Sequence, residues 1–194
     1  MAGVHLEAFL VSLSLVALAE MGDKTQLLSF VLAAQFRKPW AIIAGILVAT
    51  LANHFLAGGV GYLMAEWIPR QPMLWIVGFA FVGFGIWTLR PDSLSETPEF
   101  YKAGVFVTTA IVFFLAEMAD KTQFATVALA ARFEALWPVA LGTTAGMLVA
   151  DVPAVWLGAK LAARVPMRKV RLAAAILFIA AGLLTLAGPL KELF

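Results

Sequence analysis

Long apolar segments alternate with short polar stretches along this chain of 194 residues. The apolar segments cover residues 6–35, 40–65, 72–89, 102–132, 137–160 and 170–190. Most of them reach the roughly 20 residues that a helix needs to cross a bilayer. Prolines in the polar stretches between them fit helix starts and stops. The pattern predicts an all-α integral membrane protein with six transmembrane helices.

The first and fourth segments are longer than one crossing requires, at about 30 residues each. Both contain nearly the same nine-residue string, which reads LAEMGDKTQ at 18–26 and LAEMADKTQ at 115–123. Each string places Glu, Asp and Lys inside an apolar segment, where charges are costly and usually functional. Two shapes fit these segments: a long tilted helix, or a helix broken near the string.

The match between the two halves extends beyond the strings in a constant register of 97 residues, which pairs Gly45 with Gly142. We therefore expect a duplication, with a first three-helix repeat at 1–90, a linker at 91–101 and a second three-helix repeat at 102–194. Because three is odd, the second repeat enters the membrane from the opposite side. The halves are then inverted repeats, and the two strings face each other at similar depth.

Composition places the chain in a membrane and excludes several kinds of site. It is 62% hydrophobic and 13% charged, with a mean hydropathy of +0.93, whereas a soluble domain is about 25% charged. The absence of cysteine excludes disulfides and thiolate metal sites. The net charge of +2 is small, and basic residues in a membrane protein set orientation rather than bind nucleic acid.

The basic residues outside the strings are unevenly divided between the two membrane sides. One side carries nine of them: Arg37, Lys38, Arg90, Lys102, Lys160, Arg164, Arg168, Lys169 and Arg171. The other side carries three: Arg70, Arg132 and Lys191. Lys and Arg accumulate on the cytoplasmic side. We therefore expect both termini outside the cytoplasm and the central linker inside.

The charged residues of the two strings form the candidate cation site. Its predicted ligands are Glu20, Asp23, Glu117 and Asp120. Helical spacing would place the first two on one face, and would let Lys24 pair with Glu20, and Lys121 with Glu117. Four carboxylates and two ammonium groups give a formal charge of −2, which one divalent cation or two protons would balance. Oxygen ligands favour hard cations such as Ca²⁺, Mg²⁺ or Mn²⁺.

Further polar residues are expected to support this site. The supporting residues in the strings are Lys24, Thr25, Gln26, Lys121, Thr122 and Gln123. Asp151, in the fifth segment, is a candidate extra ligand or proton relay, since an unpaired carboxylate in a membrane is costly. Asn53 and His54 lie near the middle of the second segment, and the 97-residue register pairs His54 with Asp151. His54 could titrate near neutral pH or simply be hydrogen-bonded.

The two strings resemble the paired E-x-G-D-[KR]-[ST] motifs of the Golgi calcium/manganese–proton exchanger family, which includes the MneA-type manganese exporters of bacteria. The resemblance covers the whole chain, with one departure, Ala119 in place of the second motif's glycine. It implies exchange of Mn²⁺, or alternatively Ca²⁺, for protons. The short linker is similar to that of bacterial members, which implies Mn²⁺ export across the inner membrane.

The sequence thus predicts a secondary transporter that works by alternating access. Divalent metal and protons would compete for the same carboxylate oxygens, which would couple metal export to proton entry. No nucleophile–base pair is evident, so we expect no enzyme activity, and we expect no resident cofactor. Three alternatives stay open: a divalent cation channel, an exporter of a small organic cation, and a structural membrane protein whose charges only form salt bridges.

Overall fold

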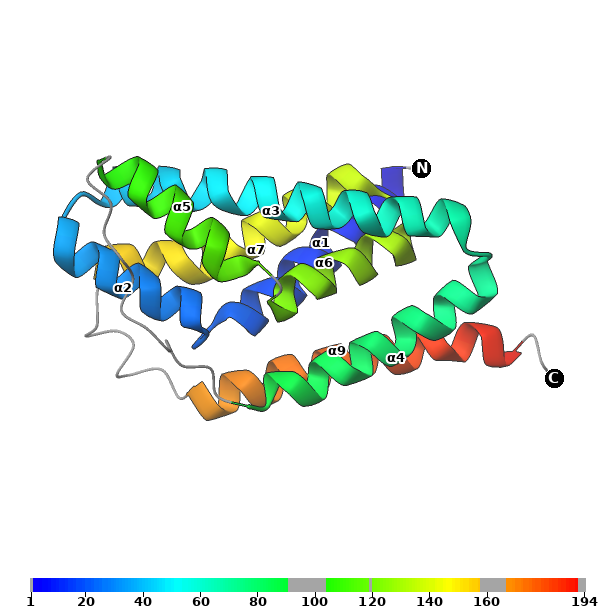
Figure 1. Cartoon of the computed structure of the whole chain (residues 1–194). Coiled ribbons are helices and arrows are strands. Elements are labelled where there is room, and N and C mark those ends of the chain that lie inside the picture. Colours follow the sequence, from blue (N-terminus) through cyan, green and yellow to red (C-terminus); the bar gives the residue numbers. More distant parts are fainter. Residues whose placement is uncertain (1, 91–103, 119, 158–166, 192–194) are drawn as a thin grey trace.

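The apolar segments form helices throughout the part of the chain that the computed structural model describes, which is residues 2–90, 104–118, 120–157 and 167–191. Within these residues the helices are α1 (Ala2–Glu20), α2 (Lys24–Phe36), α3 (Pro39–Trp67), α4 (Arg70–Thr88), α5 (Val105–Glu117), α6 (Lys121–Phe133), α7 (Leu136–Leu157) and α9 (Met167–Lys191). They lie roughly along one direction, and α1 begins at the end of the bundle at which α9 ends (Figure 1). The predicted linker and Ala119 lie outside the described residues.

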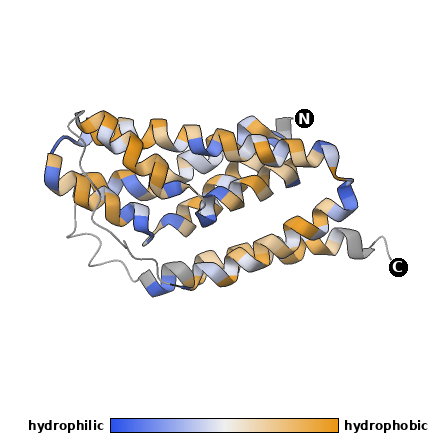
Figure 2. Ribbon diagram, in the orientation of Figure 1, coloured by the Kyte–Doolittle hydropathy of each residue, from blue (hydrophilic) through white to orange (hydrophobic). Residues whose placement is uncertain are grey.

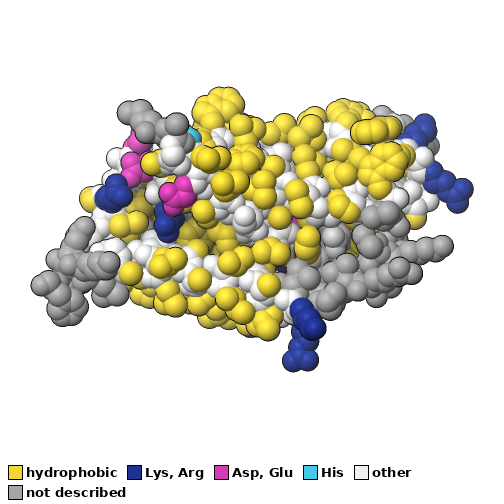
Figure 3. Space-filling model, turned by 180° about the vertical axis from the view of Figure 1, so that it is seen from behind, with side chains coloured by type: hydrophobic (Ala, Val, Ile, Leu, Met, Phe, Trp, Pro, Cys, Tyr) yellow, Lys and Arg dark blue, Asp and Glu magenta, His cyan; other side chains and the backbone are white. Residues whose placement is uncertain are grey.

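Length and apolar character match those of a membrane protein. Among the described residues, four helical stretches are long and apolar enough to cross a bilayer: Gly3–Glu20, Pro39–Trp67, Arg70–Thr88 and Leu136–Trp156. Shorter apolar helices occupy Val105–Glu117 and Leu172–Gly188. Hydrophobic side chains cover most of the visible outer surface in Figure 3, and charged ones gather towards the helix ends. The chain is therefore an all-α membrane protein.

The two long predicted segments are broken helices, which decides between the two shapes left open above. Helix α1 ends at Glu20 and α2 begins at Lys24, with Gly22 between them at a φ of 83° that favours glycine. Helix α5 likewise ends at Glu117 and α6 begins at Lys121. Both breaks fall within the strings, so the second one forms although its motif lacks the usual glycine.

The helices of each half pack mainly against helices of the other half. Helix α1 lies along α7, and α3 lies along both α5 and α6, while α4 pairs with α9. Glycines permit the close approach. A Cβ on Gly45 would lie 2.7 Å from the Cβ of Thr109 on α5, and one on Gly142 would lie 2.5 Å from the Phe9 carbonyl oxygen on α1. Positions that match in the sequence register therefore make matching contacts between the halves.

Two apolar clusters flank the breaks. One joins α1, α4, α6 and α9 through residues such as Leu15, Phe81 and Phe178, and the other joins α2, α3, α5 and α7 through Ile46 and Phe113. Figure 2 shows hydrophilic residues inside this otherwise apolar bundle, near the start of α2 and of α6. The polar residues of the strings are thus held between two apolar cores.

Candidate functional site

The four predicted carboxylates all lie at the helix breaks, and all are buried. The exposed fractions are 0% for Glu20, 1% for Asp23, 0% for Glu117 and 6% for Asp120. One oxygen each of Glu20, Glu117 and Asp120 lies within 4.8 Å of the others. Asp23 is not part of this three-oxygen group. The structure therefore brings together three of the four predicted ligands from both strings.

Each lysine pairs with the aspartate of the other string. Lys24 Nζ lies 2.8 Å from Asp120 Oδ1, and Lys121 Nζ donates to Asp23 Oδ1. The expected pairing of each lysine with the glutamate four residues earlier is wrong, because the helix is interrupted between them and the spacing no longer brings them to one face. The lysines instead join the two breaks.

The two glutamates differ in their hydrogen bonds. Thr25 Oγ1 donates to Glu20 Oε2 at 2.6 Å, and Thr122 Oγ1 donates to Glu20 Oε1. Both hydroxyls therefore serve Glu20. Both side-chain oxygens of Glu117, and Oδ2 of Asp120, are buried without a hydrogen-bond partner among the described residues. Buried carboxylate oxygens without donors are costly, so this group is suited to receive a cation or protons.

The glutamines of the strings anchor the broken helices. Gln26 accepts a bond from the Gly22 N–H at 2.9 Å and donates to the Ala150 carbonyl of α7 at 3.0 Å. Gln123 makes a longer contact, 3.5 Å, with Asn53 Oδ1 of α3, and Asn53 donates to the Phe114 carbonyl at 3.0 Å. Asn53 thus supports the break through the backbone.

Asp151 and His54 match in the sequence register but have different surroundings. Both are fully buried. Ser29 Oγ donates to Asp151 Oδ1 at 3.0 Å, whereas Oδ2 has no hydrogen-bond partner in the described part of the chain. His54 Nδ1 lies 3.4 Å from the Thr144 hydroxyl. Neither residue belongs to the three-oxygen group, so Asp151 is a separate buried carboxylate.

Sequence reasoning missed two contacts of the site. It did not anticipate Thr144, although a threonine in an apolar helix opposite a histidine is a detectable polar signal. It also did not predict the contact made by Ser29, which matches Thr126 in the 97-residue register. In the structure Ser29 bonds Asp151, whereas Thr126 Oγ1 donates to the Thr122 carbonyl of its own helix at 2.8 Å.

Comparison with known proteins identifies the family of the chain. The family model of the divalent cation/proton antiporter GDT1 matches residues 8–96 and 105–192. A Vibrio cholerae protein named "Putative manganese exporter" is 44% identical over 176 residues, covering 90% of this chain and 88% of that protein. No solved protein structure matches the chain.

Relatives of lower identity cover a similar share of the chain. The GDT1-like protein sll0615 of Synechocystis is 29% identical over 195 residues, covering 89% of this chain and 93% of its own length. GDT1-like protein 5 of Arabidopsis thaliana is 27% identical over 226 residues, covering 96% and 98%. The family comprises transporters rather than enzymes. The resemblance inferred from the paired motifs is thus confirmed, and the chain belongs to the GDT1 family of divalent cation/proton antiporters.

Proposed function

We propose that this protein exports Mn²⁺ in exchange for protons, and that the ion binds to the oxygens of Glu20, Glu117 and Asp120. The observation that carries the proposal is the buried three-oxygen group formed by both strings. Asp23 completes the cluster from its ion pair with Lys121. Mn²⁺ is favoured over Ca²⁺ by the name of the Vibrio cholerae relative, and carboxylate ligands suit Mn²⁺.

The charges of the cluster favour exchange of one divalent ion for two protons. The two lysines neutralise Asp23 and Asp120, so the formal charge of −2 falls on Glu20 and Glu117. One Mn²⁺ or two protons would each cancel it. Leaving a net charge buried in a membrane is costly, so the protein would alternate between these two neutral states.

The exchange would use alternating access between two inverted three-helix repeats. In this architecture α1 with α2 forms one membrane crossing and α5 with α6 another, which gives six crossings in total. The matching contacts of Gly45 and Gly142 support it, as does the family model's separate match to each half. Antiporters of this kind bind their substrate near the midplane, where broken helices meet.

Asp151 is our candidate for a proton relay beside the metal site. It is a fully buried carboxylate with one oxygen held by Ser29 of α2 and the other without a partner among the described residues. Protonation would remove the cost of that charge. His54, which lies against the Thr144 hydroxyl, is a weaker candidate for the same role.

The protein would lie in the inner membrane with both termini outside the cytoplasm. The start of α1 and the end of α9 share one end of the bundle (Figure 1). Arg37, Lys38 and Arg90, which follow α2 and α4, come from the more basic set of connections. Such connections remain in the cytoplasm.

Flux in proteoliposomes tests the proposal. Wild-type vesicles are loaded with a manganese-sensitive dye and a pH probe, and Mn²⁺ entry should be accompanied by proton release from the vesicle. Glu117→Gln should lower Mn²⁺ flux by about 100-fold, because it removes one carboxylate of the proposed metal site. The matched control is Glu66→Gln, at an exposed position near the end of α3.

Four results would contradict this assignment. Normal Mn²⁺ flux in Glu117→Gln would show that Glu117 is not a ligand of the transported ion. Mn²⁺ flux without any pH change would indicate a channel. Stronger flux with Ca²⁺, Mg²⁺ or Zn²⁺ than with Mn²⁺ would change the substrate. A membrane potential that drives flux would contradict the exchange of one Mn²⁺ for two protons, because that exchange moves no net charge.

A further inference from the structure

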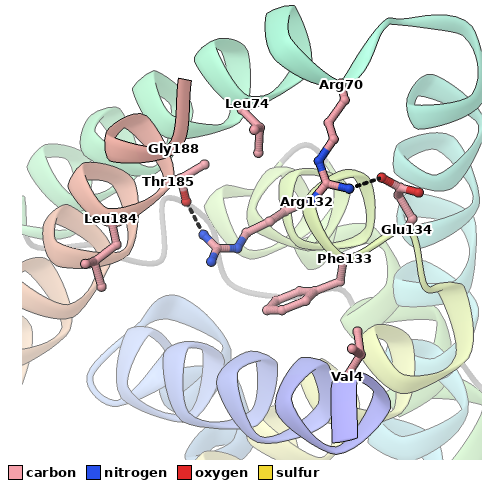
Figure 4. A pocket seen from close by; sticks show the side chains of 9 residues that line it. All are labelled: Val4, Arg70, Leu74, Arg132, Phe133, Glu134, Leu184, Thr185 and Gly188. Atoms are coloured by element: carbon pink, nitrogen blue, oxygen red, sulfur yellow. Dashed lines mark hydrogen bonds and ion pairs between the residues drawn. The ribbon is translucent and has the colours of Figure 1, made fainter. Parts of the chain in front are cut away.

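A second polar pocket lies away from the carboxylates, between α1, α4, α6 and α9 (Figure 4). Its volume is about 480 Å³, within the range of known ligand pockets. Arg70 reaches it from the start of α4 and Arg132 from the last turn of α6. Arg132 follows Lys121 by 11 residues, which is roughly 16 Å along a helix. The pocket is therefore distinct from the proposed metal site.

The positive charge of Arg132 is only partly compensated. Its guanidinium donates to the Thr185 hydroxyl of α9 and lies 5.2 Å from the centre of the Phe133 ring (Figure 4). Neither partner carries a negative charge. Glu7 acts on Arg132 through space, but among the described residues no carboxylate lies within the 4.0 Å of an ion pair with it. A guanidinium has five N–H donors, so several remain for an anion.

The second arginine is also available to a ligand. Arg70 Nη1 lies 3.8 Å from Glu134 Oε1, and the two side chains are 80% and 57% exposed. Such an exposed pair is worth little and would yield to a stronger acceptor. Two guanidinium groups and one carboxylate give the pocket lining a formal charge of +1. That charge matches a phosphodiester, which carries one negative charge, better than a phosphate dianion.

The remaining walls of the pocket are apolar. Val4, Leu74 and Leu184 line it, and the first and last are 51% and 72% exposed. Gly188 leaves room, because a Cβ there would meet only Leu74 Cδ1, at 3.9 Å. A ligand of this pocket would combine one negative charge with an apolar body, and the pocket lies at a helix end, where lipid head groups are found.

We propose that this pocket binds an anionic phospholipid, with the phosphodiester between Arg70 and Arg132 and the acyl chains against Val4 and Leu184. Basic pockets between transmembrane helices on the cytoplasmic side bind lipid head groups, and the same attraction between arginine and phosphate applies to this pocket on the opposite side. Paired arginines supply charge-assisted hydrogen bonds to phosphate oxygens. The inference does not depend on the proposed metal site, since neither its residues nor its ligand are shared.

Native mass spectrometry of the full chain in detergent tests the proposal. The protein is titrated with phosphatidylglycerol, which has one net negative charge, and with phosphatidylcholine of the same acyl chains, which has none. We expect one tightly retained phosphatidylglycerol. Arg132→Gln should weaken its binding by about tenfold, as for the loss of one charge-assisted contact. The matched control, Arg168→Gln, removes an exposed arginine at the start of α9 and should bind as the wild type does.

Gly188→Leu provides a second variant, because it fills the pocket without changing its charge. It should also lose the retained phosphatidylglycerol. If Arg132→Gln does not fold, this variant alone tests whether the pocket holds the lipid. Equal retention of phosphatidylcholine would overturn the proposal. Wild-type retention of phosphatidylglycerol by both pocket variants would also overturn it, as would displacement of the lipid by inorganic phosphate, which would identify a site for free phosphate.

Discussion

The two strings are nearly identical in sequence and unequal in structure. Glu20 accepts the hydroxyl groups of both Thr25 and Thr122, whereas Glu117 has no hydrogen-bond partner among the described residues. The lysines differ as well, since the side chain of Lys24 is 25% exposed and that of Lys121 is 6% exposed. Matching glutamates thus differ in their hydrogen bonds and matching lysines in their exposure, although each lysine pairs with the aspartate of the other string.

This difference is what the proposed alternating access between two similar halves requires. If both halves had identical surroundings, the site would open equally to both sides of the membrane. Alternating access needs a conformation in which one half differs from the other. We therefore expect the second conformation to exchange these roles, so that the threonine hydroxyls serve Glu117 and Lys121 becomes the more exposed lysine.

The largest expected effect comes from the two lysines. Lys121→Gln leaves Asp23 as a buried carboxylate without its ion pair, so the free energy of unfolding should fall by about 3–5 kcal/mol. Lys24→Gln should cost about 1–3 kcal/mol, because water reaches that pair more easily. Thermal unfolding of both variants in detergent measures the difference. Equal losses would mean that the two breaks have equivalent surroundings in solution.

The buried carboxylates of the candidate site could be predicted from the sequence, but the partners of the lysines could not. Glu20, Glu117 and Asp120 stand out because charges at membrane depth are costly, and that argument needs no geometry. The pairing of Lys24 with Glu20 assumed a continuous helix. Spacing alone cannot show a break, since an apolar segment of about 30 residues fits a long helix equally well.

The fold was predictable to a similar extent. The apolar segments gave the helices and their order, because segment length and hydropathy determine what can cross a bilayer. The packing of one half against the other, with α1 on α7 and α5 on α3, depends on which helix faces meet. These helices are apolar on all sides, so the periodicity of the sequence does not show which face of each helix meets its neighbour. Only glycines such as Gly45 and Gly142 mark the contacts.

The two glutamates should respond in opposite directions to the loss of their charge. Glu20→Gln weakens two hydrogen bonds to a charged acceptor and should lower the free energy of unfolding by about 1–3 kcal/mol. Glu117→Gln removes a carboxyl group that has no donor and that must either stay charged in the interior or take up a proton on folding. It should therefore raise the free energy of unfolding by a similar amount. Unfolding curves at neutral pH without divalent metal measure the sign of the change in the free energy of unfolding for each variant. A loss of stability in Glu117→Gln would mean that this carboxylate has a stabilising partner in solution.

The smallest expected effect on stability distinguishes Ser29 from Thr126, the residue that matches it in the 97-residue register. Ser29→Ala removes the hydroxyl that donates to Asp151, so a buried carboxylate loses its hydrogen bond and the free energy of unfolding should fall by about 1–2 kcal/mol. Thr126→Val should change it by less than about 0.5 kcal/mol, because the Thr126 hydroxyl only bonds the carbonyl of Thr122 in its own helix. Adding Asp151→Asn to each variant isolates the carboxylate. If Ser29 acts through Asp151, the cost of Ser29→Ala should shrink in that background, whereas an unchanged cost would assign Ser29 to helix packing alone.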